Sequence, residues 1–259
     1  MRKRYLEAYG IMPVIIDLWE KEYGMELLPI QERAVKEYGV LDGKSMVVLG
    51  ATSSGKTLIA EMASIKRACA KEKVIYAVSL KSLAEEKYRQ FQNTYSEFGI
   101  RVAVSHRDRR EFDHLIEQGY FDIAIVVYEK LHGLLIRNPD LLRETRLVVI
   151  DELQMLGDEE RGADLEVLLT MIRDRHGGLP LQIIGLSAVL SNAGEVARWL
   201  NAQLLVHETR PVELRKGVLC DGVYQYYEHN TGVVGQEFFL NDHSVPRSDG
   251  RDVIPICIQ

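Results

Sequence analysis

The sequence has few of the residues that build disulfide frameworks or protein metal sites. Among its 259 residues are three cysteines, at positions 69, 220 and 257, and no Cys-x-x-Cys pair. Its seven histidines are scattered, and no His-Glu-x-x-His motif is present. Isolated cysteines in odd number argue against a disulfide-stabilised secreted domain and favour a reducing compartment. We therefore expect no metal site made of protein ligands alone.

Long apolar runs and a positive net charge are also absent. No apolar segment approaches the roughly 18 residues that a membrane-spanning helix needs. Glu7 and Asp17 interrupt the basic and apolar N-terminus, and no signal cleavage site follows it. The net charge of −6 argues against a generally basic nucleic-acid-binding surface, although a local basic groove is still compatible with it. The expectation is a cytoplasmic protein without a membrane segment.

Short apolar runs alternate with longer amphipathic segments over most of the chain. The apolar runs predict strands at residues 46–50, 74–80, 101–105, 122–127, 147–152, 181–187 and 203–208. The amphipathic segments predict helices at residues 57–72, 83–98, 129–138, 163–176 and 194–201. This alternation is typical of an α/β fold with a mostly parallel sheet and helices on both faces. Such folds bind ligands at the carboxyl ends of their strands.

The pattern changes near residue 210. Alternating and aromatic residues around Asn230-Thr231-Gly232 predict a hairpin. Its tyrosines and phenylalanines either form a packed face or stack on nucleic-acid bases. The chain ends on the apolar run 253–259, which favours a second domain that is cut short. We therefore predict an α/β domain over residues 1–209, and an exit strand, hairpin and start of a further domain over residues 210–259.

A phosphate-binding motif follows the first predicted strand. It reads Gly-x-x-x-x-Gly-Lys-Thr and comprises Gly50, Ala51, Thr52, Ser53, Ser54, Gly55, Lys56 and Thr57. In such a P loop the backbone N–H groups and the following helix N-terminus bind phosphate oxygens. Lys56 would reach the β- and γ-phosphates, and the Thr57 hydroxyl would bind Mg²⁺. The loop alone does not separate kinases, GTPases, motors and helicases.

Two acidic residues end the predicted strand at 147–152. Paired with the P loop, Asp151 is expected to hold Mg²⁺ through its water shell. Glu152 is expected to orient or deprotonate an attacking water. No Asn-Lys-x-Asp motif, which would read guanine, is present, so the sequence favours ATP over GTP.

The tetrad Asp151-Glu152-Leu153-Gln154 resembles the DExH/D box of superfamily 2 helicases. Further segments resemble other motifs of that family in the same order: Leu28-Pro29-Ile30-Gln31, Leu80-Lys81-Ser82-Leu83-Ala84, Glu129-Lys130, Arg161-Gly162-Ala163 and Gly185-Leu186-Ser187-Ala188. Over about residues 27–220 the set resembles the Ski2-like branch, in particular the archaeal repair helicases related to the helicase part of polymerase theta.

The resemblance implies a RecA-like motor domain that hydrolyses Mg-ATP to drive movement on single-stranded DNA or RNA. It assigns adenine reading to Gln31 and the relay of the ATP state to Gln154 and Ser187. The residues that it places toward nucleic acid are Lys81, Glu129, Lys130, Arg161 and Gly162. It also implies a second RecA-like domain, absent from this chain, whose arginine fingers complete the site. The chain alone should therefore bind ATP and hydrolyse it poorly.

Several residues depart from the family pattern, and two of them lie in the relay of the ATP state. Gln154 replaces a His, and its amide can still donate a hydrogen bond toward Ser187. Val189 replaces a Thr, so a hydroxyl is lost. Two further functions therefore stay open: a translocase or remodeller that does not separate strands, and a degenerate, nucleotide-gated binding module. A small-molecule P-loop kinase would explain neither the acidic box nor the Ser-Ala segment.

A basic cluster comprises Arg107, Arg109 and Arg110. It is either a phosphate contact or a solvated turn.

Overall fold

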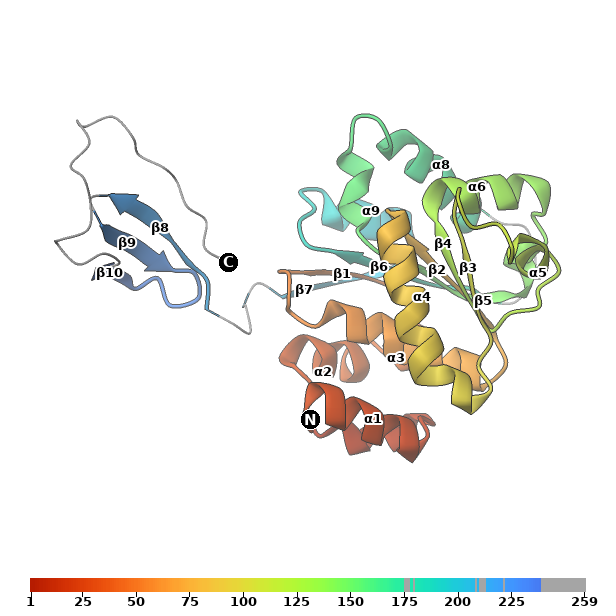
Figure 1. Ribbon diagram of the computed structural model, residues 1–259, viewed down its shortest axis with the longest axis horizontal. Coiled ribbons are helices and arrows are strands. Elements are labelled where there is room, and N and C mark those ends of the chain that lie inside the picture. Colours follow the sequence, from red (N-terminus) through yellow and green to blue (C-terminus); the bar gives the residue numbers. More distant parts are fainter. Residues whose placement is uncertain (175–177, 179, 208, 210–212, 221, 239–259) are drawn as a thin grey trace. The chain divides into compact units, whose positions relative to one another are not determined.

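The computed structural model shows two units, and each is described here by itself (Figure 1). The described residues are 1–174, 178, 180–207, 209, 213–220 and 222–238. By their contacts, residues 1–50 and 55–207 form the first unit, and residues 51–54 and 208–259 form the second. The predicted domain limits stay predictions.

A seven-stranded sheet runs through the first unit in the order β3-β4-β2-β5-β6-β1-β7, and each neighbouring pair is parallel. The strands are β1 (Met46–Gly50), β2 (Lys73–Val78), β3 (Val102–Ser105), β4 (Ile123–Val127), β5 (Thr145–Ile150), β6 (Gln182–Ser187) and β7 (Gln203–His207). Their bounds lie within two residues of the predicted ones. One difference matters, because β5 ends at Ile150 and both acids of the box follow the strand.

Helices cover both faces of this sheet. The α-helices are α1 (Pro13–Tyr23), α2 (Pro29–Lys36), α3 (Lys56–Cys69), α4 (Lys81–Tyr95), α5 (Asp113–Glu117), α6 (Tyr128–Arg137), α7 (Leu141–Glu144), α8 (Gly162–Arg173) and α9 (Ala193–Trp199). The 3-10 helices are η1 (Lys3–Tyr9), η2 (Val40–Asp42), η3 (Ser96–Phe98) and η4 (Leu153–Gly157). The five predicted helices correspond to α3, α4, α6, α8 and α9, whereas α1 and α2 precede the first predicted element.

Alternate residues of each central strand pack into different hydrophobic cores. On β2, Val74, Tyr76 and Val78 join one core, and Ile75 and Ala77 join the other. The first core is completed by α1 to α4 and the second by α6, α8 and α9; Figure 1 shows α1, α2 and α3 together along one side of the sheet. Because successive side chains of a strand point to opposite faces, a strand buried on both faces is apolar throughout. The predicted α/β class is confirmed.

A buried polar chain ties α1 to the helix that follows the P loop. Trp19 is fully buried, and its Nε1 donates to the Tyr95 hydroxyl at 2.7 Å. Tyr95 in turn donates to the Glu61 carboxylate on α3, which also accepts from Gln90 Nε2 at 3.2 Å. Burial raises the pKa of Glu61 above its usual range. Helices α1, α3 and α4 are thereby joined around one carboxyl group.

The second unit contains a three-stranded antiparallel sheet in the order β10-β9-β8. Its strands are β8 (Arg215–Cys220), β9 (Val223–Glu228) and β10 (Val234–Phe238). The β9–β10 pair confirms the predicted hairpin around Asn230. Tyr224 is buried and stacks on Tyr226 at 5.4 Å, as a packed face requires, whereas Phe238 is 76% exposed. The apolar run 253–259 lies outside the described residues.

Within the ranges given above, no helix is long and apolar enough to cross a membrane. The cytoplasmic location stays a prediction.

Candidate nucleotide and nucleic-acid site

The predicted motifs follow strands that lie side by side. Strand β1 pairs with β6, β6 with β5, β5 with β2 and β2 with β4. The register aligns Leu49 with Ser187, so the segment before the P loop lies beside the Ser-Ala segment. All these strands are parallel, and their carboxyl ends therefore share one edge of the sheet (Figure 1). The fold thus gathers motifs that are far apart in the sequence.

The end of the P loop has a backbone that only glycine adopts without strain. Gly55 has φ +89° and precedes α3 directly. A Cβ at this position would lie 2.4 Å from Gln31 Nε2 and 2.7 Å from Leu28 Cδ1. The Lys56 ammonium donates to the Gly50 carbonyl at 2.6 Å, back across the loop. The loop residue Ser53 also has a left-handed backbone, with φ +66°. Both left-handed residues give the loop the tight bend that phosphate binding needs.

Gln31 connects the segment before α2 to the P loop. Its Oε1 accepts from the Leu28 N–H at 2.8 Å, which caps the first turn of α2. Its Nε2 donates to the Gly55 carbonyl at 3.0 Å. The side chain is buried, with 3% exposed. Both polar atoms of the amide are therefore bonded within the protein, and adenine reading by Gln31 stays a prediction.

The acidic box begins one residue after β5. The Asp151 N–H continues the sheet by donating to the Ala77 carbonyl at 2.9 Å, and Glu152 then takes a left-handed backbone with φ +61°. Asp151 Oδ1 accepts from the Glu152 N–H at 3.1 Å, and Oδ2 accepts from the Tyr76 hydroxyl at 3.2 Å. The Tyr128 hydroxyl donates to the Asp151 carbonyl. Burial and the nearby charge of Glu152 raise the pKa of the Asp151 carboxyl group.

A hydrogen-bonded link joins the acidic box to the end of β6. Gln154 Nε2 donates to the Glu152 carboxylate. Gln154 Oε1 accepts from the Ser187 hydroxyl at 2.8 Å and lies 3.3 Å from the Ala188 N–H. The predicted contact between Gln154 and Ser187 is present, but the predicted direction is wrong: the Ser187 hydroxyl donates and the Gln154 amide oxygen accepts, because the amide nitrogen is already bonded to Glu152. Val189, where the resemblance leads one to expect Thr, is 74% exposed.

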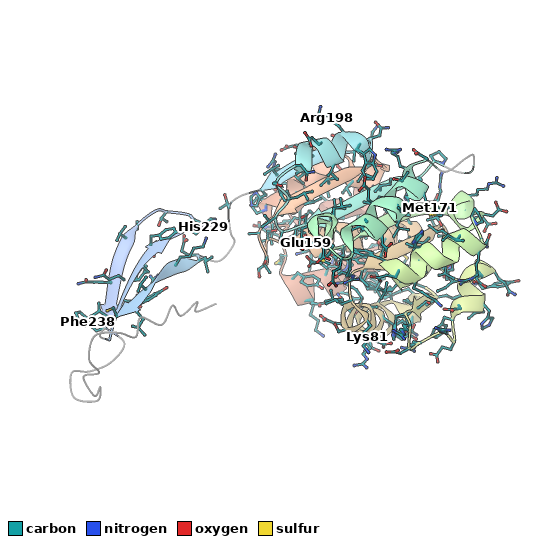
Figure 2. The ribbon with its side chains drawn as sticks, turned by 90° about the horizontal axis from the view of Figure 1, so that it is seen from above. Lys81, Glu159, Met171, Arg198, His229 and Phe238 are labelled. Atoms are coloured by element: carbon teal, nitrogen blue, oxygen red, sulfur yellow. The ribbon has the colours of Figure 1, made fainter. Side chains whose placement is uncertain are left out.

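The residues predicted to face nucleic acid are held by ion pairs. Arg161 Nε donates to Glu129 at 2.8 Å, and its guanidinium also donates to the Ser79 carbonyl after β2. Lys81 lies at the surface at the start of α4 (Figure 2) and pairs with Asp108 at 2.8 Å. The structure thus brings Arg161 and Glu129 together, as members of one predicted set.

Two further members of that set contact residues that were not predicted. Lys130 pairs with Asp113, which also accepts from the Ser105 hydroxyl. Gly162 begins α8, and a Cβ there would lie 2.5 Å from the Leu156 carbonyl oxygen. Gly162 is therefore needed for close packing of the segment after the acidic box.

The basic cluster divides into one half-buried residue and two exposed ones. Arg109 makes two hydrogen bonds to Glu85, at 3.0 and 2.9 Å, and its guanidinium lies 4.5 Å from the centre of the Tyr88 ring. This arginine stabilises the turn after β3. Arg107 and Arg110 are exposed, and Arg110 donates to the Arg107 carbonyl at 3.1 Å.

The family model of the DEAD/DEAH box helicases matches residues 28–196, the part of the chain that carries these motifs. The chain belongs to the DEAD/DEAH box helicase family. The resemblance to DExH/D-box helicases is confirmed, and membership of this family implies that the chain uses ATP. The match begins in the Leu28–Gln31 segment and ends within α9, so it covers most of the first unit.

Among its relatives in this family are two proteins named ATP-dependent DNA helicase Hel308. The chain is 43% identical to that of Pyrobaculum calidifontis over 207 residues, which are 80% of this chain and 28% of the relative. It is 40% identical to that of Pyrococcus horikoshii over 246 residues, which are 95% of this chain and 33% of the relative. The chain therefore spans about a third or less of the length of these relatives.

A solved helicase shares the fold. The structure titled DUF1998 helicase MrfA bound to DNA superposes with a TM-score of 0.63 and 21% identity. The superposition covers 78% of this chain and 30% of that chain. The predicted RecA-like helicase fold is confirmed.

Sequence reasoning missed the two tyrosines that contact Asp151. Tyr76 lies inside β2 and Tyr128 begins α6, and both are buried. In the sequence Tyr76 is one more residue of an apolar strand, and Tyr128 directly follows such a strand. No motif marks them, because their role depends on the pairing of β2 with both β4 and β5.

Proposed function

We propose that this chain is a motor domain of an ATP-dependent DNA helicase, which binds Mg-ATP and uses its hydrolysis to drive movement on single-stranded DNA. The observation that carries the proposal is the hydrogen-bonded link from Glu152 through Gln154 to Ser187. It joins the acid that acts on the attacking water to the segment after β6. A P-loop kinase of small molecules has no use for such a link. DNA is favoured over RNA because both Hel308 relatives are named DNA helicases.

In this proposal the P loop and α3 bind the phosphates. The first backbone N–H groups of a helix and its dipole attract anions, and α3 begins at the loop. The Lys56 ammonium exchanges its hydrogen bond with the Gly50 carbonyl for oxygens of the β- and γ-phosphates. Gln31 keeps the loop attached to α2 while this exchange occurs.

The protein groups present fit a hydrated magnesium ion. Each Asp151 carboxylate oxygen accepts a hydrogen bond from the protein, at 3.1 or 3.2 Å, and retains a further lone pair. Thr57 contributes an exposed hydroxyl at the start of α3. Magnesium keeps several waters and takes few protein oxygens, and when bound it neutralises charge on the phosphates. Glu152 orients the attacking water and accepts its proton.

The nucleic-acid side of the proposal rests on Lys81, Glu129, Lys130 and Arg161. Lys81 and its partner Asp108 are 70% and 57% exposed. Exposed ion pairs of this kind contribute about 0–1 kcal/mol, so DNA phosphates can replace Asp108 at little cost. Arg161, by contrast, keeps the segments after β2 and β4 in one arrangement through Ser79 and Glu129. The motor then grips a strand along the same edge that carries the P loop.

We also propose that a second RecA-like domain completes the motor. The relatives are at least three times the length of the aligned segment, which leaves ample room for one. Its arginine fingers would stabilise the charge that develops on the transferred phosphate. The chain alone would bind nucleotide tightly and turn it over slowly.

A second candidate function is a translocase or remodeller that moves on DNA without separating strands. The exposed Val189 favours it, since this side chain provides no hydroxyl beside Ser187 for the relay of the ATP state. A strand-displacement assay on the protein with both motor domains separates the two functions. Strand release that depends on ATP favours the helicase, and ATP hydrolysis without strand release favours the translocase.

The proposal is tested first on nucleotide binding by this chain. A fluorescent ADP analogue should bind to the wild type, and Lys56→Ala should weaken its affinity by about a hundredfold, as expected for loss of charge-assisted contacts to the phosphates. Lys36→Ala is the matched control, because this lysine lies on α2 in an exposed pair with Glu32. Equal affinities of wild type and Lys56→Ala would refute a nucleotide site at this loop.

A further inference from the structure

Tyr76 is a fully buried tyrosine whose hydroxyl reaches the acidic box. Its ring packs in the first hydrophobic core, edge-on to Phe91 at 6.0 Å. Its hydroxyl donates to Asp151 Oδ2 at 3.2 Å. A buried hydroxyl needs a hydrogen-bond partner, and here the carboxylate is that partner.

The contacts around Asp151 hold its backbone and its side chain separately. The Asp151 N–H donates to the Ala77 carbonyl, and the Asp151 carbonyl accepts from the Tyr128 hydroxyl. The Glu152 N–H holds Oδ1 from within the same turn. Tyr76 alone, among the described residues, contacts the side chain from another element. Tyr76 and the Glu152 N–H therefore hold one carboxylate oxygen each and together fix the rotation about the Cβ–Cγ bond.

A cation on α4 lies over the Tyr76 ring. Lys87 Nζ is 5.9 Å from the centre of that ring and 6.0 Å from that of Phe91, and it donates to Gln90 at 3.0 Å. The same helix begins at Lys81. The ring of Tyr76 is therefore held between α4 and the acidic box, and its hydroxyl cannot swing to another partner without repacking the core.

We propose that Tyr76 is a positioning residue that fixes the Asp151 carboxylate for the hydrated magnesium ion of the nucleotide complex. This inference rests on the proposed function. It assigns to an apolar strand of the sheet a role in metal binding, because a carboxylate held at only one of its oxygens has to be ordered further each time the ion binds.

The test is the magnesium dependence of nucleotide binding in Tyr76→Phe, which removes the hydroxyl and keeps the ring. The affinity of the chain for a fluorescent ADP analogue is measured in excess Mg²⁺ and in excess EDTA. For the wild type Mg²⁺ should tighten binding. For Tyr76→Phe that tightening should fall by about tenfold, the equivalent of one hydrogen bond to a charged group. The affinity in EDTA should stay within about twofold of the wild type, since the phosphate-binding residues are unchanged.

Tyr95→Phe is the matched control. Tyr95 lies in the same core, is also fully buried and also donates to a carboxylate, but that carboxylate belongs to Glu61. Its loss should lower stability without changing the effect of Mg²⁺. An unchanged magnesium effect in Tyr76→Phe, or equal losses in both variants, overturns the inference. Failure of Lys56→Ala to weaken binding in EDTA would instead overturn the proposed function, so the two failures are distinguishable.

Discussion

Gly55→Ala should be among the most destabilising single-methyl changes in the first unit. A residue other than glycine at φ +89° costs about 1–2 kcal/mol. The new Cβ would lie 2.4 Å from Gln31 Nε2, so the Gln31 side chain must move. Its two hydrogen bonds, to the Gly55 carbonyl at 3.0 Å and from the Leu28 N–H at 2.8 Å, contribute about 0.5–1.5 kcal/mol each. After the smaller entropy of the unfolded alanine chain is subtracted, the expected loss is about 2–4 kcal/mol.

Gly99→Ala separates the backbone cost from the contact cost. Gly99 also has a left-handed backbone, with φ +70°, but no atom lies within 4 Å of a Cβ built there. This variant should lose only about 1 kcal/mol. The assay is urea unfolding followed by tryptophan fluorescence, because Trp19 and Trp199 both lie in the first unit. Equal losses in Gly55→Ala and Gly99→Ala would refute the reasoning.

A double variant tests the contact with Gln31 directly. Gln31→Ala removes the nearest atom that the new Cβ would meet, together with both of its hydrogen bonds, and leaves the contact with Leu28 Cδ1 at 2.7 Å. In that background Gly55→Ala should cost less than it does in the wild type, which gives a coupling energy of about 1–3 kcal/mol. Additive losses would show that Gln31 does not restrict the loop.

Three further predictions concern side chains around the site. Glu61→Gln should flatten the dependence of stability on pH. In the wild type the pKa of Glu61 is higher in the folded state than in the unfolded state, so the free energy of unfolding falls as the pH rises from the unfolded pKa toward the folded pKa. The fall is about 1.4 kcal/mol for each unit between the two pKa values. Urea unfolding at pH 5 and pH 8 measures this, and equal losses in the variant at both pH values would contradict it. Gln154→Ala should leave nucleotide affinity within about twofold of the wild type and lower DNA-stimulated ATP hydrolysis by about tenfold or more. Gln154→His should retain most of the DNA-stimulated hydrolysis, since His can also bridge Glu152 and Ser187. Arg161→Lys should raise the DNA concentration for half-maximal stimulation of ATP hydrolysis by about tenfold, because a lysine cannot bond to Glu129 and the Ser79 carbonyl together. An unchanged DNA requirement would count against a role of Arg161 in holding these two segments together for DNA binding.

The sequence was most informative where local chemistry decides the structure. The strand bounds followed from continuous apolar runs, and the positions of Lys56 and Asp151 followed from motifs whose spacing encodes a turn and a helix start. Helix α1 was not predicted, because only Ile15, Ile16 and Trp19 are buried along its eleven residues, and their partners lie far away in the sequence. Tyr76 was missed for the same reason: its partner Asp151 becomes its neighbour only when β2 pairs with β5.

Gln31 has contacts that motif transfer does not supply. The resemblance assigns it to adenine, and that role stays a prediction; the structure adds that its amide joins α2 to the P loop. The hydrogen bond from Gln31 to the Gly55 carbonyl joins residues that are far apart in the sequence. It depends on how α2 packs on α3, which no local pattern encodes.

The central claim is that hydrolysis of ATP at this P loop drives movement on DNA. The most direct measurement is ATP hydrolysis by the protein that carries this chain together with its second motor domain, without polymer, with single-stranded DNA and with single-stranded RNA. Lys56→Ala is the blank. The account predicts Lys56-dependent hydrolysis that single-stranded DNA stimulates by about tenfold or more, as a motor coupled to its track requires. Stimulation by RNA alone would move the proposal to RNA, and Lys56-dependent hydrolysis that ignores both polymers would contradict it.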